Sequence, residues 1–161
     1  MISSPRRREG LLPAVLLLLG VVAAGAVGMA AFAGGPVEVA LPVEVDDPAC
    51  TAASAHWPRE VDGQVRAETE PSDPRVAAWG DPAVIARCGM PSLGPTENLC
   101  VVVNGVDWVV EDLGDGARLT TFGRKPAIEV LVPKERGPGP QVLPAFADAA
   151  KELPRSDLAC T

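Results

Sequence analysis

The stretch CVVVNGVDWVVEDLGDGARLTTFGRKPAIEVLVP, residues 100–133, decides the fold of this 161-residue chain. Short turns divide it into β-branched, apolar runs, and Asn104-Gly105 is a favoured two-residue hairpin turn between the first two. The last run places three apolar residues on one strand face: Ile128, Val130 and Val132. Consecutive antiparallel strands are therefore predicted over this stretch.

Further elements are predicted on both sides of these strands. Segments 63–71 and 83–88 predict strands, whereas 71–82 and 89–98 predict loops rich in proline and glycine. A short helix is expected to begin at the N-cap Asp47 and to end at Pro58. Its inner face carries Cys50, Ala53 and Trp57.

Residues 143–154 predict a second, amphipathic helix. Its apolar stripe consists of Leu143, Phe146, Ala147, Ala150 and Leu153. The predicted fold class is α+β: an N-terminal transmembrane helix, then a small, mostly antiparallel sheet of about five or six strands covered by two helices and stapled by disulfides.

The predicted membrane span is residues 11–33, which contain no charge. A helix of this length, at about 1.5 Å per residue, crosses a hydrocarbon core of about 30 Å. Arginines precede it and acidic residues follow it, so the positive-inside rule places residues 1–10 in the cytoplasm and the C-terminal part outside. A single-pass plasma-membrane anchor is favoured. The alternative is a secreted protein, cut from a signal peptide after Ala31-Phe32-Ala33.

Residues 34–46 predict an extended linker that leads to an extracytoplasmic domain over 47–161. The linker contains PVEV twice, at 36–39 and 42–45. A proline-containing spacer rises about 3 Å per residue, which would hold the domain tens of ångströms from the bilayer. The alternative is that the second PVEV already forms an edge strand.

All the cysteines follow the predicted span: Cys50, Cys88, Cys100 and Cys160. An even number in an oxidising compartment predicts two disulfides, in any of three connectivities. Metal binding is the rival interpretation, but the spacing lacks a C-x-x-C pair and His56 is the only histidine. Each disulfide would contribute about 2–4 kcal/mol to a domain whose few aromatic residues predict a thin core.

The charge of the chain excludes one class of partner. The formal net charge is −7, and without Arg6, Arg7, Arg8 and Glu9, which together carry +2, it is −9. Such a domain repels phosphate backbones, so nucleic acid is not expected as a partner. Anionic lipid surfaces are disfavoured for the same reason, which leaves the N-terminal helix as the expected membrane contact.

No catalytic set or cofactor site is expected. With one histidine, and with the cysteines assigned to bridges, neither a Ser-His-Asp nor a Cys-His arrangement can form. The chain contains no phosphate-binding glycine loop and no dinucleotide motif. A pair of carboxylates acting as in glycosidases remains the alternative. Its candidates are Asp81, Asp107, Glu111 and Glu129.

Six residues are candidates for binding, since Trp and Arg supply large contact areas beside a groove. They are Trp79, Asp81, Asn104, Asp107, Trp108 and Arg124. The structural alternative places both tryptophans in the core and lets Asp81 cap its own turn. In that alternative Asn104 takes a positive φ in the hairpin.

Three segments, AAWGDPAVIARCG, VVNGVDW and LTTFGRKPAIEVLVP, occur in an order that resembles an actinobacterial family of secreted or membrane proteins. The family is defined only as a domain of unknown function, and the resemblance covers most of residues 45–154. It implies a bond between Cys50 and Cys88, which leaves Cys100 for Cys160. It also implies an envelope location, but no activity, substrate or catalytic residue.

The expected function is that of a membrane-anchored, non-catalytic extracytoplasmic module that binds an envelope protein or a wall polymer, or serves a structural role. The alternative is a carboxylate-dependent envelope hydrolase or transferase. A concave pocket with converging carboxylates would favour the enzyme, whereas shallow polar grooves on a sheet face would favour binding. The oligomeric state is left open.

Overall fold

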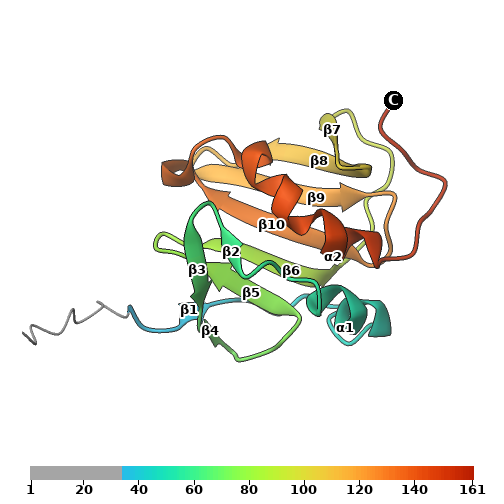
Figure 1. Ribbon diagram of the computed structural model, residues 1–161. Coiled ribbons are helices and arrows are strands. Elements are labelled where there is room, and N and C mark those ends of the chain that lie inside the picture. Colours follow the sequence, from blue (N-terminus) through green and yellow to red (C-terminus); the bar gives the residue numbers. More distant parts are fainter. Residues whose placement is uncertain (1–33) are drawn as a thin grey trace, which may run out of the picture. The chain divides into compact units, whose positions relative to one another are not determined.

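Eight strands form one sheet in the order β2-β3-β5-β6-β10-β9-β8-β7, and every neighbouring pair is antiparallel (Figure 1). The structure is a computed structural model that describes residues 34–161. The strands are β2 (Glu60–Val61), β3 (Gln64–Ala67), β5 (Val76–Trp79), β6 (Val84–Met90), β7 (Leu99–Val103), β8 (Val106–Asp112), β9 (Gly116–Phe122) and β10 (Ala127–Pro133). The predicted antiparallel sheet is confirmed, with eight strands instead of five or six.

The remaining elements are short. A two-stranded parallel pair joins β1 (Val37–Glu38) to β4 (Thr69–Glu70). The helices are α1 (Pro48–Ser54), the 3₁₀ helices η1 (Lys134–Arg136) and η2 (Gly139–Phe146), and α2 (Ala147–Lys151). The predicted cytoplasmic segment 1–10 and membrane span 11–33 lie outside the described residues. None of the helices within residues 34–161 has the length and apolar character needed to cross a membrane.

The predicted hairpin between β7 and β8 is present. Val103 pairs with Val106 across Asn104-Gly105, whose φ values are 51° and 78°. Two positive φ angles give the turn the twist that antiparallel strands require, and Asn and Gly tolerate them best. β8, β9 and β10 then follow as successive neighbours, which confirms the strand order predicted for residues 100–133.

Four predicted elements need correction. Segment 63–71 holds two short strands, β3 and β4, instead of one, and helix α1 ends at Ser54, before Pro58. Segment 71–82, predicted as a loop, contains strand β5, all of whose residues are buried; such a strand lacks the alternating pattern that identifies half-buried strands. The predicted helix over 143–154 is instead η2 followed by the short α2. Pro144 has no N–H and therefore interrupts regular helix formation. The predicted apolar stripe is nevertheless buried throughout.

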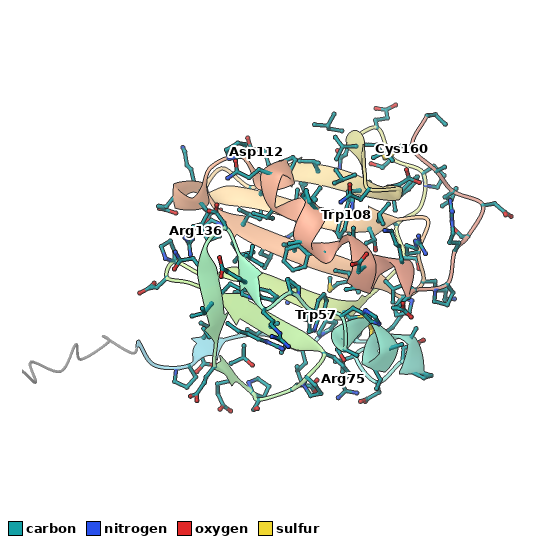
Figure 2. All side chains as sticks on the ribbon, viewed as in Figure 1. Trp57, Arg75, Trp108, Asp112, Arg136 and Cys160 are labelled. Carbon is teal, nitrogen blue, oxygen red and sulfur yellow. A yellow bond between two sulfur atoms is a disulfide. The ribbon has the colours of Figure 1, made fainter. Side chains whose placement is uncertain are left out.

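The core lies between the sheet and the helices (Figure 2). The Phe146 ring meets the rings of Trp57 and Trp79 edge-on, at centroid distances of 6.2 and 5.3 Å. Such edge-to-face contacts are favourable beyond the area they bury. The indole N–H of Trp57 donates to the carbonyl of Pro74, and that of Trp79 to the carbonyl of Pro58, both at 3.1 Å. The polar atoms of both buried rings are therefore satisfied.

Two disulfides, Cys50–Cys88 and Cys100–Cys160, join segments far apart in the sequence. This is the pairing that the resemblance implies. The first ties α1 to β6, and both of its cysteines are fully buried. The second ties edge strand β7 to the C-terminal segment, with both cysteines partly exposed. Disulfides persist in oxidising compartments, so they indicate an extracytoplasmic protein.

Residues 34–42 have the predicted extended backbone, whereas residues 43–46 form turns, and the segment lies against the body instead of standing away from it. The Arg87 guanidinium donates to the carbonyl of Ala40 at 3.1 Å, and the Glu44 amide donates to the carbonyl of Gly89 at 2.9 Å. Neighbouring strand residues point to opposite faces. Cys88 points toward α1, so this segment lies on the second face of the sheet, opposite the helices. The strand within it, β1, falls in the first PVEV and not in the second.

Gly89 permits this close approach. A Cβ atom at this position would lie 2.5 Å from the backbone nitrogen of Val45, and the φ of Gly89 is 110°. Both the space and the backbone conformation therefore require glycine.

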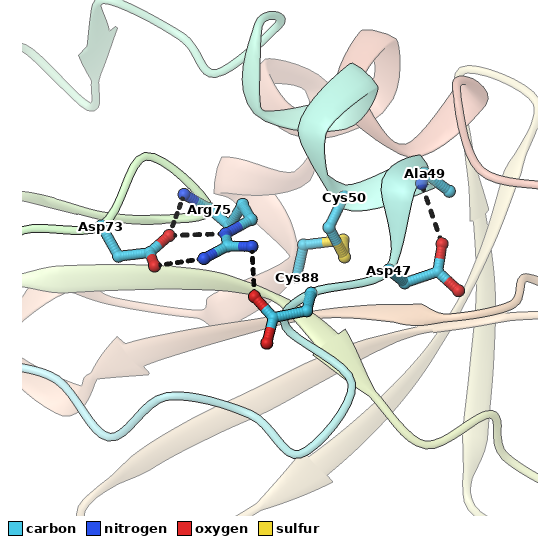
Figure 3. Close-up of polar contacts among 7 residues, drawn as sticks. Asp47, Ala49, Cys50, Asp73, Arg75 and Cys88 are labelled. Atoms are coloured by element: carbon cyan, nitrogen blue, oxygen red, sulfur yellow. Dashed lines mark hydrogen bonds and ion pairs between the residues drawn. A yellow bond between two sulfur atoms is a disulfide. The ribbon is translucent and has the colours of Figure 1, made fainter.

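The end of the extended segment is clamped beside α1 (Figure 3). Arg75 forms ion pairs with Asp73 at 2.6 Å and with Asp46 at 2.7 Å. The next residue, Asp47, caps α1, because its carboxylate accepts from the Ala49 amide at 2.8 Å. The chain is thereby held where it passes from the second face to the helix face.

The two disulfides should differ in their sensitivity to reduction. A small reductant at neutral pH should open Cys100–Cys160 first, because Cys50 and Cys88 are fully buried. Differential alkylation with mass spectrometry would follow each bond over time. Equal rates, or alkylation of any cysteine before reductant is added, would contradict the structure.

The clamp predicts a loss of stability in acid. Hydrogen bonds from Arg75 lower the pKa of Asp73 below its ordinary value of 3.8. A carboxylate with a depressed folded-state pKa stabilises the fold above its unfolded pKa, and this contribution is lost as the pH falls through the folded value. Asp73→Asn and Arg75→Gln should both flatten the fall in unfolding free energy below about pH 4, measured by urea titration at several pH values. A fall as steep as in the wild type would refute this assignment.

Candidate functional site

A row of alternating charges crosses four central strands on the second face of the sheet. From β6 to β8 its members are Arg87, Glu129, Arg118 and Glu111, hereafter the charge row. Arg87 stands opposite Glu129, and Arg118 stands opposite Glu111. Facing residues of antiparallel strands point to the same side of the sheet, so the backbone register brings the four side chains together.

The charge row is joined by short ion pairs. The Arg87 Nε donates to Glu129 Oε1 at 2.6 Å, and the Arg118 Nη1 donates to Glu111 Oε2 at 2.9 Å. The Arg118 Nε lies 3.2 Å from Glu129 Oε2, which is close enough for an ion pair. It is buried and makes no hydrogen bond within the described residues. The charge of Arg118 is therefore balanced by Glu129 as well as by Glu111.

The Arg87–Glu129 pair of the charge row is more buried than the Arg118–Glu111 pair. The side chain of Glu129 is 3% exposed and that of Arg87 18%, whereas Arg118 and Glu111 are 38% and 44% exposed. A buried carboxylate without partners would be costly, which explains why both oxygens of Glu129 face arginines. The exposed end, Arg118 with Glu111, is the part that a ligand can reach.

A groove of about 600 Å³ lies over the charge row. Its floor is formed by the charge row together with Val109 and Thr120. Its wall is the loop 91–98 that connects β6 to β7, hereafter the strap loop. No hydrogen bond among the described residues joins the strap loop to the rest of the protein. The volume lies within the range of ligand sites, about 300–1,000 Å³.

The groove contains two carboxylates, but their contacts favour binding over catalysis. Both oxygens of Glu129 face arginines, and Glu111 is paired with Arg118. A general acid or base must be free to exchange a proton with a substrate, and a nucleophile needs a base beside it. The single histidine, His56, lines no part of the groove, and its Nε2 lies 3.7 Å from Glu152 Oε1.

The six residues predicted to bind do not gather in this groove. The rings of Trp79 and Trp108 are fully buried in the core, where Trp108 lies beneath the helices (Figure 2). Asn104 forms the β7–β8 turn, whereas Asp81 lies exposed in the β5–β6 turn at the other end of the strands.

Arg124 and Asp107 lie at the Asn104 end. The buried Arg124 guanidinium donates a hydrogen bond of 2.7 Å to the carbonyl of Leu153, just beyond α2. It also donates one of 3.4 Å to the carbonyl of Lys151, the last residue of α2. Burial, and secondarily the charge of Arg155, lower the pKa of Arg124, while the charge of Asp107 opposes this shift. Capping the end of a helix is a structural role for this arginine.

The sequence signal for the groove was incomplete. Glu111 and Glu129 are among the predicted carboxylates, but Arg87, Arg118 and the strap loop are not in the predicted site. Single charges inside the apolar runs AVIARC and AIEVLVP could have marked Arg87 and Glu129. Their pairing depends on the register between strands distant in sequence. No group of three or more metal-ligating residues occurs in the part of the chain that the structure describes.

The difference in burial between the two ion pairs predicts that removing the charge of Glu129 and of Glu111 lowers stability by unequal amounts. Glu129→Gln should lower the unfolding free energy by about 3 kcal/mol, because it leaves the Arg87 charge without its buried partner. Glu111→Gln should cost less than about 1 kcal/mol, since this pair is exposed to solvent. Urea unfolding of both variants would measure the difference, and equal losses would contradict it.

Comparison with known proteins identifies a family. No curated protein and no solved structure was found to match the chain. A family model described as "Protein of unknown function (DUF3515)" matches residues 11–158, which is most of the chain. The chain therefore belongs to the DUF3515 family of unknown function.

Proposed function

We propose that this protein is a membrane-anchored, non-catalytic module of the cell envelope, whose groove binds an extended segment of another envelope protein. The uncharged residues 11–33 support a single-pass anchor with a cytoplasmic N-terminus, and the disulfides support an extracytoplasmic body. The resemblance to an actinobacterial family supports an envelope location.

The half-exposed guanidinium of Arg118 carries this proposal. It lies at the floor of the groove, where its side chain is 38% exposed and pairs with Glu111, which is 44% exposed. Exposed ion pairs are weak, so Glu111 gives way at little cost to a ligand carboxylate or carbonyl. A guanidinium binds such planar groups through two parallel hydrogen bonds.

The lining of the groove favours a peptide over a wall polymer. Sugar rings are held well by aromatic faces, and none of the residues that line this groove is aromatic. The strap loop supplies backbone groups without partners in the rest of the protein, together with Leu93 and two prolines. An extended peptide pairs readily with free backbone groups and places side chains in apolar pockets.

Photocrosslinking in intact cells tests this proposal. A photoreactive residue replaces Thr96 in the strap loop of the full chain, and Val65, 73% exposed on β3 and outside the groove, serves as the control site. Thr96 should capture one protein, identified by mass spectrometry, and the Val65 control should not.

The variant Arg118→Gln should reduce this capture about tenfold, because it removes a charge-assisted contact. Capture of wall polymer alone, or capture unaffected by Arg118→Gln, would contradict the proposal. Release of wall fragments by the purified protein, abolished in Glu111→Gln, would favour the carboxylate hydrolase instead.

A further inference from the structure

The two edges of the sheet differ in their protection. One edge is β2, only two residues long, and Glu60 places a charge on it. The other edge is β7, five residues long, at the margin of the sheet near the C-terminal segment (Figure 1). Proteins commonly protect edge strands by making them short, charged or covered, because an edge offers unpaired backbone groups. β2 shows such protection, whereas β7 is longer and uncharged, although the C-terminal segment is bonded to it at Cys100.

β7 is apolar and accessible. Its residues Leu99 and Val102 are 62% and 60% exposed, among the most exposed large apolar side chains described. No charge and no proline occurs from Asn98 to Val106, although 22% of the chain is charged. Backbone hydrogen bonds between this strand and the C-terminal segment are absent within residues 34–161.

We propose that β7 is a pairing surface for a second copy of this chain, so that two sheets join edge to edge about a two-fold axis. An antiparallel pair centred on Val101 sets Leu99 opposite Val103 of the partner subunit, apolar against apolar. The two strands would form the backbone hydrogen bonds that each edge leaves unmade. This inference is independent of the groove and of the ligand proposed for it.

The distribution of charge allows two copies of this chain to meet at β7. The residues after the predicted span carry a net charge of −9, so two copies repel each other over most of their surfaces. The uncharged stretch 98–106 is where they can approach without placing like charges face to face. The Cys100–Cys160 bond holds β7 to the C-terminal segment, which limits fraying of the strand before pairing.

The contact is small, so the association should be weak. A strand of five residues is about 17 Å long, and the pairing would fall below the area of stable interfaces, about 1,200–2,000 Å². A membrane anchor would strengthen it by confining both copies to one surface.

Sedimentation equilibrium of the full chain in detergent micelles, from micromolar to millimolar concentration, tests the proposal. The wild type should dimerise reversibly, and Val102→Glu should raise the dissociation constant at least about tenfold, because it places two like charges in the contact of the uncharged edges. Val65→Glu makes the same substitution at an equally accessible strand position outside the edge and should dimerise like the wild type. A monomeric wild type, or dimerisation unchanged by Val102→Glu, would overturn the proposal.

Photocrosslinking provides a second measurement that does not depend on a variant's stability. A photoreactive group at Leu99, in a mixture of isotopically light and heavy full chains, should join the β7 peptides of two copies. The same group at Val65 should not produce this product. Absence of mixed light–heavy β7 products would exclude pairing through this edge.

Discussion

The bond between Cys50 and Cys88 holds together the part of the fold on which the groove depends. Helix α1 has seven residues, too few to be stable alone, and the bond fastens it to the middle of the sheet. The segment that precedes α1 lies on the second face, where the Ala40 carbonyl accepts a hydrogen bond from the Arg87 guanidinium. The covalent bond therefore also positions a segment that supports the buried end of the charge row.

The two faces of the sheet differ in what covers them and in the side chains that they carry. The helix face is closed around Phe146 by apolar packing. The second face is only partly covered by residues 34–46, and its central positions carry paired charges. Pairing offsets the cost of burying these charges under the strap loop. At the exposed end of the charge row, the Arg118 guanidinium is accessible to solvent. This asymmetry is the reason why the proposed binding groove lies on the second face.

Pairing also shows why the number of carboxylates in the chain does not by itself indicate a catalytic site. Any acidic domain supplies enough Asp and Glu for an imagined catalytic pair. Their chemistry depends on the groups that touch them, and arginines from other strands touch Glu111 and Glu129 here. Trp79 and Trp108, which composition marks as contact residues, are needed in the core because the chain has few other large side chains.

The sequence by itself determined the local elements. Asn104-Gly105 specified a hairpin, alternation in 127–133 specified a strand, and Asp47 with Pro48 specified a helix start, because each depends on neighbouring residues. The tertiary structure alone decided that β6 pairs with β10, that residues 34–46 lie on the second face, and that Arg87 meets Glu129. Those contacts join residues tens of positions apart, and their register is set by the whole sheet, which no local pattern encodes.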